Sequence, residues 1–231
     1  MLRSGALQVL GWPIHQRALK RMTRLEEFFV YVEPRAGGTK FLAYQQASGK
    51  KRAAFLSVLS AIAVDPLGIN FLDLGPGYGE TLDACFERGA KSVSFTEIDP
   101  FFYHFNRLKK FTTPHHLNHL FSLHRLPARK FNLIWCKGAI VADHAILSQR
   151  LPFRKWRFSS WITQLEQLAA PGANILLCPH WRSDGTYRRV EDTRTCVLSR
   201  LLLSCGYTTL PQIPGHNHEP EYPLTYHKAL P

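Results

Sequence analysis

A glycine-rich turn is the part of this sequence best able to do chemistry. The stretch Phe71-Leu72-Asp73-Leu74-Gly75-Pro76-Gly77-Tyr78-Gly79 begins as an apolar strand, and Glu80-Thr81-Leu82 then predicts a helix start. Because glycine has no Cβ atom, such a turn can adopt positive φ and let a ligand lie against bare main chain. The first turn of the helix points unpaired N–H groups at that ligand. These residues predict a small-molecule site.

Glu97 is a candidate partner for a ribose in that site. It lies 20 residues after Gly77, at the predicted end of the next strand. A carboxylate at this position can accept hydrogen bonds from both ribose hydroxyls. A dinucleotide is the less favoured ligand, because Glu80 stands where its fingerprint has a last glycine. The alternatives are that Glu97 is a solvated acid at a strand end, or that Asp99 takes its place.

Negative charge gathers around the turn of an otherwise basic chain. Residues 53–100 carry two Lys or Arg and seven acids, although the net charge of the whole chain is +12. Asp73 lies within an apolar strand, where an unpaired carboxylate is costly. A ligand of cationic character fits this surrounding better than a polyphosphate. The alternative role for Asp73 is to cap the following turn.

Other side chains offer proton transfer or metal binding. His144 and His180 follow the predicted strands at 131–136 and 174–178, where either could take a proton from a hydroxyl acceptor or simply be a polar cleft residue. The dense set His115, His116, His119 and His124 has no interleaved acid or cysteine, so no metal site is predicted. Cys136 is expected to be buried and not nucleophilic.

A basic region at residues 101–157 suggests an anionic partner. Residues 101–157 carry eleven Lys or Arg and one acid. Basic and aromatic residues alternate in part of this region: Arg150, Phe153, Arg154, Lys155, Trp156, Arg157 and Phe158. Together with Lys50-Lys51-Arg52, these side chains could bind phosphates and stack on bases. A solvated basic face is the plain alternative. A small or glycan acceptor is favoured over RNA, because no RNA-binding module is recognisable.

Alternating strands and helices must position these residues. Helix patterns at 81–88, 100–110, 160–169 and 192–204 alternate with strand patterns at 71–74, 92–98, 131–136 and 174–178, and two late strands follow near 207–212 and 224–228. Pro171-Gly172 predicts a turn before the strand at 174–178. The alternation predicts an α/β fold, a Rossmann-like doubly wound sheet of about seven strands, mostly parallel, with helices on both faces.

The N-terminal part has a weaker pattern. Residues 1–52 are expected to form a short helical cap or substrate-facing segment, with a short helix at 41–46, and residues 53–231 the cofactor-binding core. A separate helix is predicted from Lys51, ending near Pro66. Five scattered cysteines without a CxxC pair indicate reduced thiols, and no run approaches the length of a membrane helix. A cytoplasmic protein is the resulting expectation, and the oligomeric state is left open.

The ordered set of motifs resembles class I S-adenosylmethionine-dependent methyltransferases. It comprises 71–79, Glu97, Leu126-Pro127, the strand at 131–134, and 168–172 leading into 175–177. The resemblance implies methyl transfer, with S-adenosylmethionine held by a set of residues along the turn and the strand ends: Asp73, Gly75, Gly77, Tyr78, Gly79, Glu97, Ile98, Ser122, Leu123 and Cys136. Ser122 departs from the Asp common there, and Asn132 from the Asp common in the fourth strand. A third possibility is a cofactor-binding interaction module without catalysis.

Overall fold

The architecture was established from a computed structural model of the chain. It describes residues 12–27, 39–97, 99–117, 122–137, 154–178, 202–210 and 225–229. The helices are α2 (Trp12–Arg21), α4 (Thr39–Ala61), α5 (Glu80–Glu87), α6 (Pro100–Arg107), α8 (Arg154–Leu168) and the 3-10 helix η1 (Leu123–Arg125). The strands are β1 (Asn70–Leu74), β2 (Ser92–Thr96), β3 (Thr112–His115), β4 (Phe131–Lys137), β5 (Ala169–Cys178), β6 (Thr208–Thr209) and β7 (Thr225–Lys228).

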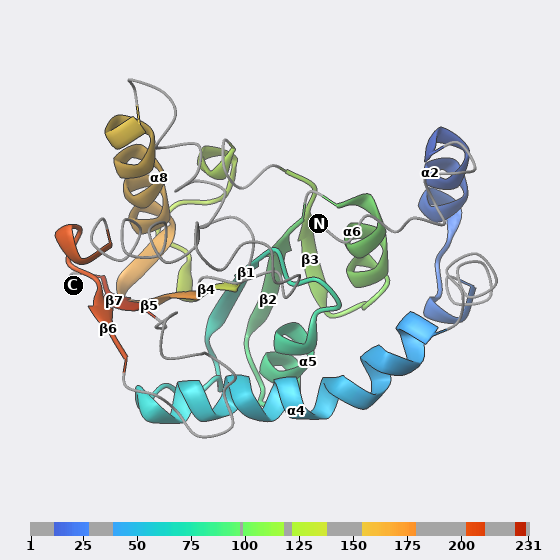
Figure 1. Cartoon of the computed structure of the whole chain (residues 1–231), viewed down its shortest axis with the longest axis horizontal. Helices are drawn as coiled ribbons and strands as arrows, with labels where there is room; N and C mark the ends of the chain where they lie inside the picture. The colour runs from blue at the N-terminus through green and yellow to red at the C-terminus, as the bar shows by residue number, and fades with distance from the viewer. Residues whose placement is uncertain are drawn as a thin grey trace, which may run out of the picture.

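All of these strands join one sheet (Figure 1), in the order β3-β2-β1-β4-β5-β7-β6. β1 pairs in parallel with β2 and β4, and β3 and β5 extend the parallel arrangement on either side. β7 runs antiparallel to both β5 and β6. The predicted doubly wound, mostly parallel sheet is confirmed: five strands form its parallel part, and β7 and β6 complete one edge. The strand order reverses between β1 and β4, which is where such sheets bind ligands.

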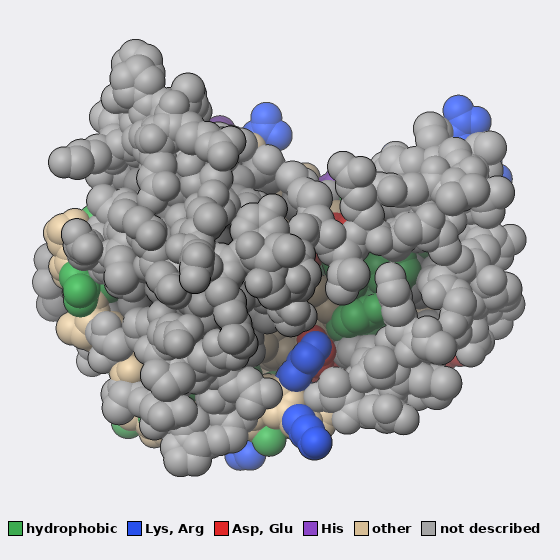
Figure 2. All heavy atoms as spheres, viewed as in Figure 1, with side chains coloured by type: hydrophobic (Ala, Val, Ile, Leu, Met, Phe, Trp, Pro, Cys, Tyr) green, Lys and Arg blue, Asp and Glu red, His purple; other side chains and the backbone are tan. Residues whose placement is uncertain are grey.

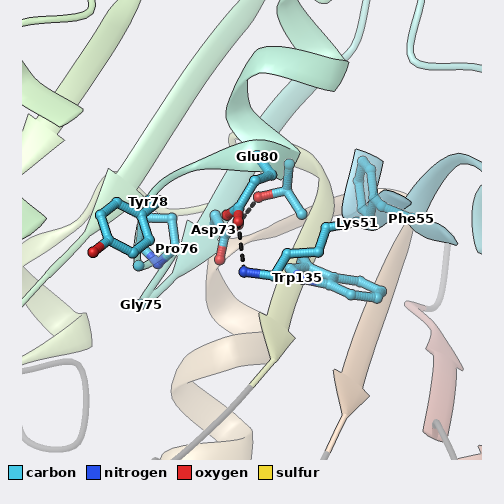
Figure 3. Close-up of a pocket in the computed structure, with 10 residues that line it drawn as sticks. Lys51, Phe55, Asp73, Gly75, Pro76, Tyr78, Glu80 and Trp135 are labelled. Carbon is cyan, nitrogen blue, oxygen red and sulfur yellow. Dashed lines mark hydrogen bonds and ion pairs between the residues drawn. The ribbon is translucent and has the colours of Figure 1, made fainter. Parts of the chain in front are cut away.

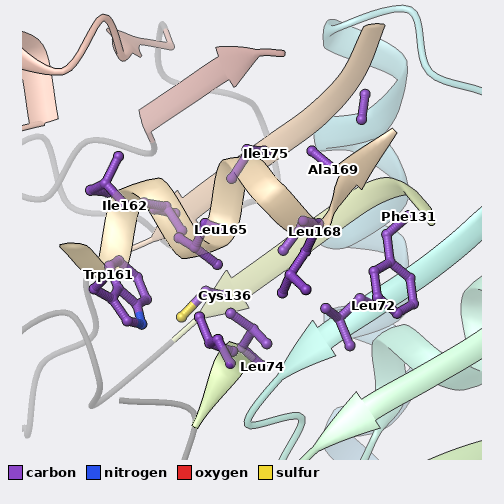
Figure 4. Packing of buried hydrophobic residues seen from close by; sticks show 14 of the residues in the cluster. Leu72, Leu74, Phe131, Cys136, Trp161, Ile162, Leu165, Leu168, Ala169 and Ile175 are labelled. Atoms are coloured by element: carbon purple, nitrogen blue, oxygen red, sulfur yellow. The ribbon is translucent and has the colours of Figure 1, made fainter. Parts of the chain in front are cut away.

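Helices cover both faces of this sheet, as predicted. Because successive side chains of a strand point to opposite faces, each central strand contributes to two cores. Phe71 and Trp135 pack with α4 and α5, whereas Leu72 and Cys136 pack with α8. Figure 4 shows Trp161, Ile162, Leu165 and Leu168 of α8 over the second face. Asp73 therefore lies on the face of α4 and α5, next to the pocket described below.

The predicted break before Lys51 is wrong. A single helix, α4, runs for 23 residues through Gly49, and in Figure 1 it passes along the edge of the molecule beneath α5. Glycine lowers helix stability without forbidding a helix, so packing of the C-terminal half of α4 can outweigh it. The boundary at residues 52 and 53 falls inside α4. The division into 1–52 and 53–231 stays a prediction.

Two further differences concern the sheet. β3 was not predicted, because Pro114 breaks a strand pattern; proline is tolerated here because β3 is an edge strand. The turn predicted at Pro171-Gly172 lies within β5, where Phe131 pairs with Ala169 but Leu133 pairs with Asn174. The added residues form an irregularity with Gly172 at φ +71°. Among the described helices, none has the length and apolar character needed to cross a membrane.

Candidate functional site

A pocket of about 290 Å³ lies at the C-terminal ends of β1 and β4. α4, β1, the glycine turn, α5 and β4 supply its lining: Lys51, Phe55, Asp73, Gly75, Pro76, Gly77, Tyr78, Glu80, Thr81 and Trp135. Figure 3 shows these side chains around the end of β1, and Figure 2 shows acidic, basic and hydrophobic side chains meeting in a recess of one face. The pocket therefore occupies the point where the strand order reverses.

The glycine turn adopts the backbone that its composition predicts. Gly75, Gly77 and Gly79 have φ values of +81°, +58° and +75°, which residues other than glycine rarely adopt. The Gly75 N–H donates a 2.9 Å hydrogen bond to the Thr96 carbonyl, which ties the turn to β2. A Cβ atom built on Gly77 would meet no described atom within 4 Å. The main chain at Gly77 thus faces open space, as a backbone-binding ligand site requires.

Asp73 places a carboxyl group in the pocket wall. It is only 1% exposed, and the Thr81 hydroxyl donates a hydrogen bond to its Oδ2. Burial raises the pKa of Asp73 to about 8; the Thr81 hydrogen bond opposes this rise, and the Glu97 and Glu80 carboxylates add to it. A cation beside Asp73 would favour its ionised form.

A second acid in the wall already has a cation. Lys51 Nζ lies 2.7 Å from Glu80 Oε1 (Figure 3), with the Glu80 side chain 8% and the Lys51 side chain 53% exposed. The neighbouring Arg52 pairs with Glu87. In the sequence, Lys51 and Arg52 belong to a basic run assigned to phosphate binding; in the structure, acids of α5 offset both charges.

Aromatic rings close another side of the pocket. The Phe55 and Trp135 ring centroids are 5.0 Å apart in an edge-on arrangement. Tyr78 packs edge-on against Phe102, at 5.0 Å between centroids. These rings give the pocket apolar walls that limit the access of water to Asp73.

Glu97 follows β2 at the same edge of the sheet. It is 5% exposed, and its Oε1 accepts a 2.9 Å hydrogen bond from the Asp99 N–H. Asp99, the alternative acceptor, instead caps α6, since its Oδ1 accepts a 2.8 Å hydrogen bond from the Phe101 N–H. The structure thus gives Asp99 a structural role. Glu97 lies just after β2 but is not among the residues that line the pocket, and its contact with a ribose stays a prediction.

Three more predicted cofactor residues, Ser122, Leu123 and Cys136, are not among the residues that line the pocket. Leu123 is fully buried in the core under α8, and Ser122 precedes it at the N-cap of η1. The Cys136 side chain also belongs to that core, while its neighbour Trp135 lines the pocket. A contact of Cys136 with a ligand would involve its main chain. Ile98, His144 and His180 lie outside the described residues.

The histidine-rich stretch separates in the structure. His115 is in β3, His116 stacks on Tyr103 with ring centroids 4.5 Å apart, and His124 is exposed in η1. His119 lies outside the described residues. Within the described part of the chain, no group of three or more His, Cys, Asp or Glu side chains is placed to hold a metal ion.

Six lining residues are absent from the predicted cofactor set: Lys51, Phe55, Pro76, Glu80, Thr81 and Trp135. Phe55 belongs to a helical apolar stripe, which predicts core packing, and it does also join the core. Trp135 lies in a strand buried on both faces, where a continuous apolar run conceals which side chains share a face. Thr81 had a usable signal, because an acid in a strand followed by a hydroxyl at the helix start suggests a hydrogen bond between them.

Comparison with known proteins identifies the fold. No protein-family profile and no curated protein matches this sequence, but many solved structures match. A Methanococcus maripaludis protein assigned as an S-adenosylmethionine-dependent methyltransferase has a TM-score of 0.54 and 8% identity, over 91% of this chain and 95% of its own. One from Listeria monocytogenes has a TM-score of 0.51 and 14% identity, over 78% and 99%.

Longer structures match as well. The bifunctional kinase-methyltransferase WbdD has a TM-score of 0.52 and 14% identity, over 80% of this chain and 39% of its own. This chain spans 50% of the CurJ carbon methyltransferase structure and 53% of a Mesorhizobium loti methyltransferase structure. At identities this low the likeness shows the fold alone: the chain has the class I methyltransferase fold, as its motifs predict.

Proposed function

We propose that this chain, whose fold is that of class I methyltransferases, binds S-adenosylmethionine and transfers its methyl group to a small-molecule or glycan acceptor. The buried carboxyl of Asp73, in a pocket beside a turn whose Gly77 faces open space, carries the proposal. S-adenosylmethionine supplies a methyl group already activated by positive sulfur. The protein's tasks are then mainly alignment and the exclusion of water.

The described residues suit distinct parts of such a ligand. Asp73 would face the methionyl ammonium, and the main chain from Gly75 to Gly79 would lie against the ligand. Glu97 would accept hydrogen bonds from the ribose hydroxyls. The segment of Ser122 and Leu123 would lie near the adenine. Because Lys51 offsets Glu80, Asp73 is the acid of the pocket wall best suited to pair with a cationic ligand.

The acceptor side of the proposal rests on fewer residues. Lys51 and Arg52 pair with acids of α5, which removes part of the basic surface that an RNA acceptor would use. A small acceptor is therefore favoured. His144 or His180 is proposed as the base if the acceptor is a hydroxyl group.

Calorimetry of the full chain with S-adenosylmethionine and S-adenosylhomocysteine tests cofactor binding. Gly77→Val would fill the open space at Gly77, and Glu97→Gln would remove a charged acceptor, so each is expected to weaken binding about tenfold or more. Gly68→Val is the matched control for the first, because Gly68 also has positive φ, +73°, and open space at its Cβ position. Glu87→Gln, an exposed acid of α5, is the control for the second.

Absence of binding by the wild-type protein would reject the proposal, as would equal losses in the test and control variants. Transfer itself is tested with radiolabelled cofactor and a fractionated cell extract. Label in a small-molecule or glycan fraction supports the favoured acceptor, and label in RNA supports the alternative. Cofactor binding without label in any fraction indicates a non-catalytic interaction module.

A further inference from the structure

Three carbonyl groups of the glycine turn accept hydrogen bonds from two side chains: Asn106, in the last turn of α6, and Lys109, just after the end of α6. Asn106 Nδ2 donates a 2.6 Å hydrogen bond to the Gly77 carbonyl. Lys109 Nζ donates to the carbonyls of Tyr78 and Gly79, at 2.9 and 3.2 Å. Three consecutive carbonyls of the turn therefore accept hydrogen bonds from this pair, called the clamp below. Neither clamp residue lines the pocket.

Lys109 is a buried cation that joins three elements. It is 7% exposed, its Nζ lies 2.8 Å from Asp83 Oδ2 of α5, and it lies 5.2 Å from the centroid of the Phe105 ring. Burial lowers the pKa of Lys109, and the Asp83 carboxylate opposes that effect. Keeping an ammonium group in such a place is costly unless its donors are satisfied. The turn carbonyls and Asp83 satisfy them.

The clamp itself is anchored. The Thr112 hydroxyl, at the start of β3, lies 2.9 Å from the Asn106 carbonyl and 2.8 Å from the Lys109 carbonyl. The Thr112 N–H also donates to the Lys109 carbonyl at 3.0 Å. These contacts tie the end of α6 to the sheet, so the two donors reach the turn from a fixed base.

Gly79 and Gly77 differ in what surrounds them. A Cβ atom on Gly79 would lie 2.1 Å from Asn106 Oδ1 and 2.9 Å from Lys109 Nζ, whereas one on Gly77 would meet nothing within 4 Å among the described atoms. The absent side chain of Gly79 leaves room for the clamp. The absent side chain of Gly77 leaves space on the side of the turn that lines the pocket.

Peptide geometry links the clamp to ligand binding. Because a trans peptide is planar, its N–H points away from its C=O. Carbonyls of Gly77 and Gly79 that point at the clamp therefore turn the N–H groups of Tyr78 and Glu80 away from it. We infer that Lys109 and Asn106 are positioning residues that orient the peptide groups of the turn for the ligand of the pocket. This inference rests on the proposed function, since it assumes that the ligand is S-adenosylmethionine.

Binding of S-adenosylhomocysteine by the full chain, together with hydrogen exchange, tests the inference. Lys109→Met is expected to raise the Kd about tenfold while the protein remains folded, because the turn is no longer pre-organised. The amides of Tyr78 and Glu80 should exchange faster, with exchange in the sheet unchanged. Lys110→Met is the matched control: it removes the same charge from the next, exposed position. Asn106→Ala is a second test variant, expected to act in the same direction.

Each outcome decides between a positioning and a merely structural role. Folded variants with wild-type Kd and wild-type exchange overturn the inference, as does failure of both Lys109→Met and Asn106→Ala to fold. If the wild-type protein does not bind S-adenosylhomocysteine, the proposed function fails. The exchange rates then still decide: faster exchange at Tyr78 and Glu80 in Lys109→Met supports the clamp, and unchanged exchange rejects it.

Discussion

Asp73 combines burial with the chemistry of the pocket. The side chain is almost fully buried beside Thr81, and two further carboxylates, Glu80 and Glu97, raise its pKa. A buried neutral carboxyl that becomes charged when a cationic ligand arrives would make pairing with the ligand selective for positive charge. The same residue must then cost the free protein stability at high pH.

Asp73→Asn tests this cost. The pKa of Asp73 is 3.8 ordinarily and about 8 in the folded protein, so between these values the folded state holds a proton that the unfolded state has released. Stability from this group is fully present below about pH 4 and is lost as pH rises toward 8. Denaturant unfolding from pH 5 to 9 should show the variant gaining stability relative to wild type as pH rises. Asp65→Asn, at an exposed position, should show no such trend.

If Asp73→Asn and wild type keep a constant difference in unfolding free energy across that range, Asp73 does not hold its proton in the folded state. The same variant should bind S-adenosylmethionine more weakly, because the ion pair with the ligand is lost.

Site residues that are unusual in their local sequence could be predicted, and residues whose role depends on tertiary contacts could not. Glycine spacing and an acid in an apolar strand singled out Gly77 and Asp73, since both are unusual locally. Lys109 carried no such signal: it lies 30 residues from Gly79, whose carbonyl it binds. Lys51 pairs with an acid 29 residues away. Contacts of that separation depend on how α4 and α6 pack, which local patterns do not encode.

α4 brings the N-terminal part of the chain to the pocket. It contributes Lys51 and Phe55 to the lining, and Gly49 interrupts its sequence one half-turn before Lys51. Nothing described lies within 4 Å of a Cβ atom built on Gly49. Since no packing or backbone requirement of the described residues explains this glycine, its effect is to weaken the helix next to the pocket.

Gly49→Ala should therefore stabilise the protein by about 0.5–1 kcal/mol, the usual difference between glycine and alanine in a helix. Urea unfolding measures the change. Gly172→Ala is the opposing control, because Gly172 also has open space but a φ of +71°, and that substitution should destabilise. A destabilising Gly49→Ala would show that α4 is not continuous through this residue.

The elements that sequence patterns predicted best are the buried central strands and the helices that follow them. β3 and the irregular start of β5 were missed for the same physical reason. Both contain proline, which is unfavourable in a strand by itself but is accepted at a sheet edge or an irregularity. Only the finished sheet decides which positions have that freedom.

Charge is distributed unevenly over the whole molecule. The net charge is +12, yet the pocket is lined by Asp73 and Glu80 with one lysine, Lys51. Positive charge at a distance attracts any polyanion weakly, and this attraction falls steeply with salt. A basic total is therefore poor evidence for a nucleic-acid site.

Fluorescence anisotropy measures the binding of labelled bulk tRNA at different salt concentrations. This measurement distinguishes a small acceptor from an RNA acceptor. With a small acceptor, tRNA binding should resemble binding of heparin, a non-nucleic polyanion, and should vanish by about 150 mM salt. Binding that persists at that salt and exceeds binding to heparin would favour the RNA alternative.

The strand order has a consequence for how the protein folds during synthesis. β1 pairs with β4 at the centre of the sheet, and the Asn70 N–H donates a 2.9 Å hydrogen bond to Asn132 Oδ1 across 62 residues of chain. On the ribosome, the turn and Asp73 emerge well before Trp135, so a nascent chain ending at β3 has the glycines but lacks one wall of the pocket. Ligand binding can thus assist folding only after β4 has joined β1.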